Sequence, residues 1–384
     1  MPDRSQDRMK SKLLIVVNEP SFFLSHRLPV AEGARRAGYE VHIATMDGES
    51  VARIRELGFL HHVLPLSRSG KNPFVELRSL IAIWWLFLKL KPVLVHLVTI
   101  KPVLYGGIAA RLARVPGVVA AISGLGYTFS DSQRRHGIVS KIIFLLYRVA
   151  LGQENLRVIF QNQDDRTVLT NLARVDSSKV DLIRGSGVDL NEYSYQPEPD
   201  CEPIVVFAAR LLRDKGLVEF VNAAEMLKKR GVSAQFVVVG DLDTGNPASI
   251  SRQELEEWRR RGTVTVFGFC SDIFKVFSDA HVVVLPSYRE GLPKVLVEAA
   301  ACGRPVVTTD VPGCRDAIEP DITGLLVPVK NATALADAIE KLIKDPELRK
   351  RMGRAGRELA EREFGIEKIV QQHLDIYRKL EARA

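Results

Sequence analysis

Two glutamates stand eight residues apart in the stretch SYREGLPKVLVEAA, at positions 290 and 298. The stretch follows an apolar run, HVVVLPS, that is typical of a buried strand, and Gly291 and Pro293 predict a turn and the first turn of a helix. A helix that begins after a glycine turn presents unpaired backbone N–H groups and a positive dipole end, which favour phosphate. Glu290 and Glu298 cannot bind phosphate, but they can accept hydrogen bonds from sugar hydroxyls. The pattern suits a ligand with both a diphosphate and sugars. Taken alone, however, the spacing is common, and an exposed glutamate at a turn and a solvated glutamate on a helix are the favoured explanation.

Two cations, Arg210 and Lys215, follow another expected strand in FAARLLRDKG (207–216). Positive charges at the end of a strand would neutralise a diphosphate leaving group. An exposed basic loop is the simpler alternative, and it is our interpretation of Arg213, which lies between them.

Further candidates lie where other expected strands end. In the second half they are Gly240, in VVVGD, and Phe267 and Gly268, in VFGFC. In the first half they are His26, Arg27, Thr99, Lys101, Gly124 and Gly126. A histidine just before a helix is often a cap or a packed residue, so ligand binding and packing are equally good readings of His26 and Arg27. Gly268 and Phe267 are equally well explained as a turn glycine and a core phenylalanine.

Short β-branched runs alternate with helical patterns along almost the whole chain, which indicates parallel sheets covered by helices on both faces. We expect two tandem Rossmann-like, doubly wound α/β domains that face each other across a cleft, where such folds bind ligands. The expected segments are a disordered extension (1–11), a first domain (12–190), a linker (191–203), a second domain (204–363) and a C-terminal helix that packs back on the first domain (364–384).

Composition excludes several classes of protein. With 384 residues, 46% hydrophobic and 26% charged, the chain is neither a disordered tail nor a small disulfide scaffold. The four cysteines form no C-x-x-C pair, so we interpret them as reduced, buried thiols and expect no metal site. The polar start and an apolar run of only five residues (13–17) do not resemble a secretion signal, and Met9 is a candidate true start.

Charge is divided unevenly between the two halves. Residues 1–190 carry 26 Lys and Arg against 16 Asp and Glu, a balance of +10, and the rest carry 28 against 30, a balance of −2. The basic half predicts an anionic partner: a membrane surface, a phosphorylated substrate or nucleic acid.

Two amphiphilic segments border short apolar runs with cations and aromatic residues, at 78–92 and 134–152. Such borders suit a membrane interface, although neither run reaches the ~20 residues of a spanning helix. We expect 78–92 to pack on the sheet, and 134–152, with Arg134, Arg135 and Lys141, to make a salt-sensitive contact with anionic lipid.

The sequence resembles the retaining family 4 glycosyltransferases of the GT-B fold, whose signature is a Glu-x7-Glu in this strand, turn and helix. The stretches that carry the resemblance are SYREGLPKVLVEA, GRPVV, TDVPG and the Arg-x4-Lys-Gly at Arg210. Residues around His26 and at 96–106, 122–130, 160–166 and 185–190 resemble the subgroup that acts on polyprenyl-diphosphate-linked sugars of bacterial surface polysaccharides. The chain lacks the Gly-Gly turn that many members have after the first strand, and the histidine that some place in the loop at 122–130.

The resemblance implies roles for individual residues. Glu290 would hold donor-sugar hydroxyls, Glu298 the ribose, and Arg210 and Lys215 the diphosphate. Backbone and side chains that would line the donor are Gly291, Leu292, Pro293, Lys294, Val295, Gly240, Phe267 and Gly268. The six first-half candidates would face the acceptor.

The implied activity is transfer of a sugar, with retention, from a nucleotide sugar such as a UDP-hexose or UDP-N-acetylhexosamine to a polyprenyl-diphosphate-linked sugar. We expect no cofactor, metal or nucleic acid, and a cytoplasmic protein held peripherally at the inner face of the plasma membrane. A sugar-nucleotide 2-epimerase of the same fold and a non-enzymatic basic protein that binds membrane or nucleic acid remain alternatives. A dehydrogenase is disfavoured because no expected strand is followed by G-x-G-x-x-G.

Overall fold

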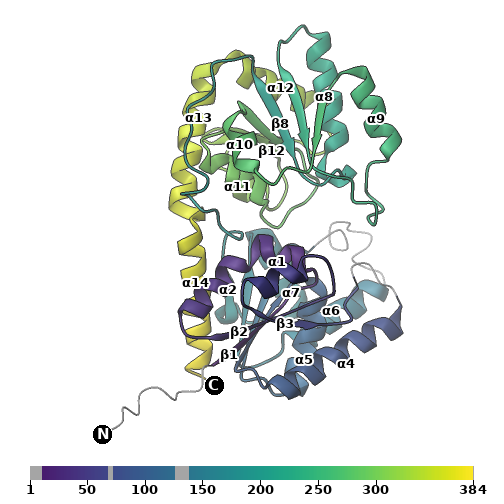
Figure 1. Cartoon of the computed structure of the whole chain (residues 1–384), viewed down its shortest axis with the longest axis vertical. Coiled ribbons are helices and arrows are strands. Elements are labelled where there is room, and N and C mark those ends of the chain that lie inside the picture. Colours follow the sequence, from purple (N-terminus) through teal and green to yellow (C-terminus); the bar gives the residue numbers. More distant parts are fainter. Residues whose placement is uncertain (1–10, 68–71, 126–137, 384) are drawn as a thin grey trace. The chain divides into compact units, whose positions relative to one another are not determined.

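The computed structural model describes residues 11–67, 72–125 and 138–383, with no side-chain detail at 138–141 (Figure 1). Several predicted residues lie outside the described part of the chain: the expected extension except Ser11, and Gly126, Arg134 and Arg135. The side chain of Lys141 is not described either. Contacts between Cα atoms group the described parts of Met1–Ser186 and Glu367–Ala384 into unit 1, and Gly187–Ile366 into unit 2.

Unit 1 is built on a parallel sheet with the strand order β3-β2-β1-β4-β5-β6-β7. Its strands are β1 (Lys12–Val16), β2 (Glu40–Thr45), β3 (Leu60–Val63), β4 (Leu94–Val98), β5 (Gly117–Ile122), β6 (Leu156–Phe160) and β7 (Val180–Leu182). Its helices are α1 (Pro20–His26), α2 (Leu28–Arg36), α3 (Val51–Glu56), α4 (Pro73–Leu90), α5 (Gly107–Leu112), α6 (Ile138–Ala150), α7 (Gln163–Ala173) and α14 (Ile366–Glu381). The central strands β4 and β5 are buried along their whole length, as a sheet covered on both faces requires.

Unit 2 repeats the plan with the strand order β10-β9-β8-β11-β12-β13. Its strands are β8 (Ile204–Ala208), β9 (Gln235–Val239), β10 (Thr265–Gly268), β11 (Val282–Leu285), β12 (Val306–Thr309) and β13 (Gly324–Val327). Its helices are α8 (Leu217–Lys229), α9 (Arg252–Arg261), α10 (Ile273–Ser278), α11 (Lys294–Ala301), α12 (Ala332–Lys344) and α13 (Pro346–Leu359). Both sheets are parallel α/β structures, as the alternation of strands and helices predicts.

The proline-containing stretch at 191–203, expected to be a linker, packs on unit 2. Arg349 donates to the Glu198 carboxylate at 2.7 Å, and Arg357 donates to the backbone oxygen of Tyr193 at 2.7 Å. Arg304, only 2% exposed, donates to the carbonyl of Gln196 at 3.0 Å. Arginine side chains thus satisfy the backbone carbonyls of a segment that forms no strand, which sequence patterns do not reveal.

The last helix, α14, is tied to the sheet of unit 1 by polar contacts. The Tyr377 hydroxyl lies 2.7 Å from Nδ1 of His96 on β4, and Tyr39 donates to the Glu381 carboxylate at 2.6 Å. His373 and Arg27 lie buried beside this pair, and the Nε2 atoms of both histidines have no hydrogen-bond partner. Burial lowers the pKa of His373 to about 3 and holds the pKa of His96 well below its usual range, so both rings are neutral at physiological pH.

One expectation needs correction. Cys302 and Cys314 are buried, but Cys201 is exposed and Cys270 is half-buried, so the thiols are not uniformly buried. The segment at 78–92 falls largely in α4 and packs on the core through Ile83 and Phe87, as expected, while the outward face of α4 leaves apolar side chains in water. Among the residues that the structure describes, no helix is long and apolar enough to span a bilayer.

The buried histidines make a prediction about acid stability. A histidine with a pKa of 6.5 in the unfolded chain and a much lower pKa in the folded chain costs stability as the pH falls below 6.5, because the unfolded state then binds more protons. We expect the free energy of unfolding of unit 1 to fall by up to about 1.4 kcal/mol per pH unit for each histidine between pH 6 and pH 4. Urea titrations of a Trp258→Phe background, in which Trp84 and Trp85 report on unit 1, measure this slope.

The matched variant is His373→Leu, which removes one titrating ring from the cluster at similar volume. Its slope between pH 6 and pH 4 should be shallower than that of the parent. An equal slope in the two proteins would contradict the assignment.

Candidate active site

The carboxyl edge of the unit 2 sheet gathers the predicted residues at the point where strand order reverses. Strand β8 lies between β9 and β11, so the chain leaves β8 on one side and returns on the other. The loop after β8 carries Lys215, and the loop after β11 carries Glu290. Because β8 and β11 are hydrogen-bonded neighbours, their loops meet, and such a reversal is where open α/β sheets bind ligands.

Lys215 and Glu290 form an ion pair through Nζ and Oε1, and both side chains are largely buried. The same Oε1 accepts a hydrogen bond from the Ser287 hydroxyl at 2.8 Å. Thr309, at the end of β12, donates in turn to the Ser287 carbonyl. One carboxylate oxygen of Glu290 is therefore held by two donors, which fixes the side chain and directs its other oxygen elsewhere.

Two glycines let these loops approach each other. Gly216, next to Lys215, has φ +76°, and a Cβ there would lie 2.1 Å from the carbonyl oxygen of Pro286. Gly313 has φ +81°, and a Cβ there would lie 2.5 Å from the carbonyl oxygens of Glu290 and Gly291. No other residue fits either position without moving the backbone that carries the ion pair.

Arg210 takes part in a separate contact on the same edge. Its Nη1 lies 2.7 Å from Oδ2 of Asp243, which follows β9, and its side chain is about half exposed. Gly240 donates to the carbonyl of Gly268 at 2.8 Å, so the ends of β9 and β10 are joined as well. Arg210, Gly240 and Gly268 thus share the edge that holds Lys215 and Glu290, but Arg210 and Lys215 have different carboxylate partners.

Glu298 is buried in α11, and its carboxylate is held inside unit 2. Lys294 lies 2.8 Å from Oε1, and the Tyr193 hydroxyl also bonds to the carboxylate. Burial raises the pKa of Glu298, and the nearby Lys294 ammonium opposes that rise. Only 6% of Glu298 is exposed, which excludes the alternative that it is a solvated glutamate on the surface of the helix.

The segment between the glutamates differs in one detail from the expectation. Pro293 is the N-cap of α11, and the helix begins at Lys294, so Pro293 does not stand in the first turn. A proline has no N–H, which leaves Lys294 and Val295 as the first-turn donors that could meet an anion. Gly291 and Leu292 are buried before the cap.

The exposure of Phe267 and Arg213 distinguishes between the alternatives given for each of them. Phe267 is 68% exposed, which excludes the alternative of a core phenylalanine. Arg213 is half exposed and paired with Glu254, in keeping with the surface position expected for it.

The first-half candidates do not form one cluster. Arg27 is 2% exposed, donates to the His26 carbonyl at 2.9 Å, and lies in the buried cluster under α14. His26 is half-buried, with Nδ1 2.6 Å from the Ser25 hydroxyl. Lys101 lies 2.6 Å from the Glu76 carboxylate.

Two of these candidates have unusual backbone. Thr99 has φ +72°, and its buried hydroxyl has no hydrogen-bond partner. Gly124 has φ +116°, a conformation that favours glycine. Thr99 and Gly124 follow the adjacent strands β4 and β5, so they share the carboxyl edge of the unit 1 sheet.

Three residues of the unit 2 site were missed by sequence reasoning: Ser287, Asp243 and Tyr193. Ser287 directly follows the strand before the first glutamate, and Asp243 ends an Asp-x-Asp whose Asp241 accepts from the Phe269 N–H at 3.1 Å. The positions of Ser287 and Asp243 after strands were signals from which the sequence could have identified them. No sequence pattern pointed to Tyr193, because its partner, Glu298, lies about a hundred residues away in the chain.

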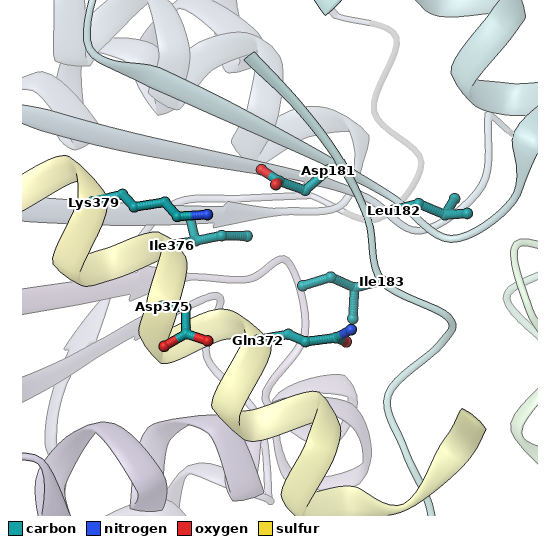
Figure 2. Close-up of a pocket in the computed structure, with 7 residues that line it drawn as sticks. All are labelled: Asp181, Leu182, Ile183, Gln372, Asp375, Ile376 and Lys379. Carbon is teal, nitrogen blue, oxygen red and sulfur yellow. The ribbon is translucent and has the colours of Figure 1, made fainter. Parts of the chain in front are cut away.

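A pocket elsewhere holds none of the predicted residues. It lies in unit 1 beside β7 and α14, and Figure 2 shows its lining, which consists of Asp181, Leu182, Ile183, Gln372, Asp375, Ile376 and Lys379. Arg157 already holds the Asp181 carboxylate at 2.7 Å. Within the described parts of the chain, no group of three or more His, Cys, Asp or Glu side chains is placed to hold a metal ion.

Comparison with known families gives two matches that follow the two units. Residues 193–359 match the family model described as "Glycosyl transferases group 1", and residues 12–162 match "Glycosyl transferase 4-like".

Similarity also extends over whole chains. The chain is 30% identical over 377 residues to the N,N'-diacetylbacillosaminyl-diphospho-undecaprenol alpha-1,3-N-acetylgalactosaminyltransferase of Campylobacter jejuni, covering 92% of this chain and 97% of the relative. It is 26% identical to the capsular polysaccharide biosynthesis glycosyltransferase CapM of Staphylococcus aureus, covering 92% and 94%. It is 25% identical, over 79% of each chain, to an Escherichia coli UDP-Gal:alpha-D-GlcNAc-diphosphoundecaprenol alpha-1,3-galactosyltransferase.

Solved structures agree on the fold. Sucrose-phosphate synthase of Thermosynechococcus elongatus matches with a TM-score of 0.78 at 23% identity, over 98% of this chain and 100% of that one. Anabaena HepE, solved with UDP and glucose, matches with a TM-score of 0.77 at 19% identity, over 96% and 99%. Both sheets, the Glu290 and Glu298 motif and the full-length similarity agree: the chain belongs to the GT4 family of retaining glycosyltransferases, with the GT-B fold.

Proposed function

We propose that this enzyme transfers a hexose or N-acetylhexosamine from a UDP sugar to a lipid-diphosphate-linked sugar during surface polysaccharide assembly. The contact between Lys215 and Glu290 at the carboxyl edge of the unit 2 sheet carries the donor half of the proposal. It places a cation and a fixed carboxylate side by side, which suits a ligand with phosphate next to sugar hydroxyls.

In the proposed reaction, the bond between the sugar C1 and the oxygen of the β-phosphate breaks, and an acceptor hydroxyl oxygen bonds to C1 on the same face. The acceptor proton passes to the oxygen of the departing diphosphate. Lys215 and Arg210 stabilise the negative charge that grows on that diphosphate, while Glu290 holds hydroxyls of the donor sugar. Glu298 accepts from the ribose.

The acceptor half of the proposal is supported by the relatives. Two of them, from Campylobacter jejuni and Escherichia coli, are named for acceptors linked to undecaprenyl diphosphate. We place the reaction at the cytoplasmic face of the plasma membrane, with Thr99, Lys101 and Gly124 as the acceptor-side residues to test first. These follow β4 and β5 in unit 1.

The decisive experiment offers a panel of UDP sugars with a short-chain polyprenyl-diphosphate-linked sugar and reads the products by mass spectrometry. We expect one added hexose or N-acetylhexosamine on the lipid, with UDP released in equal amount. Release of UDP without a glycolipid product, together with an epimerised sugar, would instead favour the 2-epimerase. The Glu290→Gln protein is the matched control for contaminating activity.

Lys215→Ala should lower kcat by about 10² or more, because its positive charge is needed most as the sugar–phosphate bond breaks. The matched control is Arg213→Ala, which removes a cation from the same turn that is paired with Glu254 on the surface. Steady-state kinetics on both proteins, with folding checked by thermal melts, measure the difference. Wild-type turnover in a folded Lys215→Ala protein would refute the role of the lysine.

Substitutions of the two glutamates should change different kinetic parameters. Glu290→Gln should lower kcat by about 10²–10³, because a carboxylate beside the donor sugar stabilises the positive charge that develops on its ring. Glu298→Gln should mainly raise the KM for the donor, since ribose contacts are alike in the ground and transition states. Kinetics with varied UDP sugar separate the two effects, and wild-type turnover of Glu290→Gln would show that its role is structural.

Ser287→Ala should lower kcat by about tenfold, since a hydrogen bond to a charged group contributes about 1.5–3 kcal/mol and this one positions Glu290. The test is a double-mutant cycle: in the Glu290→Gln background, Ser287→Ala should have little further effect on kcat. Independent, additive losses would mean that Ser287 acts only through the stability of the loop.

A further inference from the structure

Asp243 is paired with Arg210, and the proposed reaction gives a role to Arg210 but none to Asp243. Nη1 of Arg210 lies 2.7 Å from Oδ2 of Asp243, and 53% of the Arg210 side chain is exposed against only 9% of the Asp243 side chain. A long, half-exposed arginine has many rotamers, and fixing it in one of them costs conformational entropy. The buried carboxylate therefore holds a side chain that would otherwise move in solvent.

The loops that carry these two residues are fixed to each other by backbone hydrogen bonds. Arg210 follows β8, and Asp243 follows β9, which is the neighbour of β8 in the sheet. Leu211, next to Arg210, donates through its N–H to the carbonyl of Asp241 at 3.0 Å and accepts from the N–H of Ile250 at 2.9 Å. The pairing of Arg210 with Asp243 is thus set by the backbone of two loops, unlike a chance contact between two surface side chains.

Burial of the partner distinguishes the cations of this turn from one another. Arg213 pairs with Glu254, whose side chain is 32% exposed. The carboxylate partners of Arg210 and Lys215 are only 9% and 12% exposed. The two cations that the proposed reaction assigns to the diphosphate are therefore the two that are held by buried carboxylates, as a preorganised site requires.

We propose that Asp243 is a positioning residue, which holds the guanidinium of Arg210 where it meets the diphosphate of the nucleotide sugar. The inference rests on the proposed function, because it takes the diphosphate role of Arg210 from there. A guanidinium has several N–H donors, and Asp243 occupies Nη1, so other donors remain for phosphate oxygens. Binding energy of the ligand is then not used to immobilise the arginine.

The binding experiment measures the affinity of the full chain for UDP by isothermal titration calorimetry. Asp243→Ala should weaken UDP binding by about three- to tenfold, the loss expected when the ligand itself has to immobilise a flexible side chain. Asp243→Asn keeps an oxygen that accepts from Nη1 and should bind UDP like the parent. The control Glu254→Ala removes the partner of Arg213 on the same turn and should also bind UDP like the parent, with folding of all variants checked by thermal melts.

Two further measurements separate positioning from a general effect on the fold. Uridine lacks the diphosphate, so Asp243→Ala should leave its affinity unchanged in ligand-observed NMR titrations. In the Arg210→Ala background, Asp243→Ala should have little further effect on UDP binding, because Asp243 acts through Arg210.

Several results would overturn the positioning role. They are UDP binding like the parent in Asp243→Ala, an equal loss for UDP and uridine, and independent losses from Asp243→Ala and Arg210→Ala. Tighter binding of UDP by both Asp243→Ala and Asp243→Asn would also overturn it, because the carboxylate would then compete with the diphosphate for Arg210.

Failure of the proposed function gives different results. UDP binding is measured without a donor sugar or an acceptor, so a protein that shows the Asp243 effect but transfers no sugar would refute the proposed reaction and leave the positioning role intact. UDP binding like the parent in Arg210→Ala, or a parent protein that does not bind UDP, would refute the proposed donor contacts and this inference with them.

Discussion

The ion pair between Lys215 and Glu290 is the contact on which the unit 2 site depends. It joins two loops that lie 75 residues apart in the chain but adjacent in space, because β8 and β11 are hydrogen-bonded parallel neighbours. The Glu290 carboxylate is held from a second side: Ser287 donates to the same carboxylate oxygen, and Thr309 donates to the Ser287 carbonyl. Three neighbouring strands of the sheet, β8, β11 and β12, therefore set the position of one carboxylate. A charge that is fixed in this way can stabilise a reacting ligand without first rearranging its surroundings.

The close approach of the two loops restricts the conformation of their backbone. The loops meet so closely that Gly216 and Gly313 have no room for a Cβ, and both adopt positive φ. Gly240 is subject to the same constraint near the carbonyl oxygen of Ala209, where a Cβ would lie at 1.9 Å. These glycines explain why the motif extends beyond its charged residues. A side chain at any of the three positions would separate strand ends that have to lie together.

Unit 1 uses buried polar groups differently. Arg27, His96, His373 and Tyr377 meet under α14, where they join the last helix to the sheet instead of facing a ligand. The outward side of the same unit carries exposed apolar side chains on α4, with cations around them. A sheet covered on both faces needs only one face of each helix, so the outward face of α4 is not required by the core of unit 1.

The sequence by itself determined the two α/β units, most of their strands and the carboxyl-edge position of Glu290, Lys215 and Arg210, because hydrophobic periodicity and turn glycines are local signals. It also determined the family, through motifs of fixed spacing. Only the tertiary structure decided which charges pair: Lys215 with Glu290, Arg210 with Asp243, and Glu298 with Lys294 and Tyr193. It likewise decided that Arg27 is buried, that 191–203 packs on unit 2 and that α4 exposes apolar side chains. Contacts between distant segments and the direction of a helix face depend on how elements pack, and a linear pattern does not contain that information.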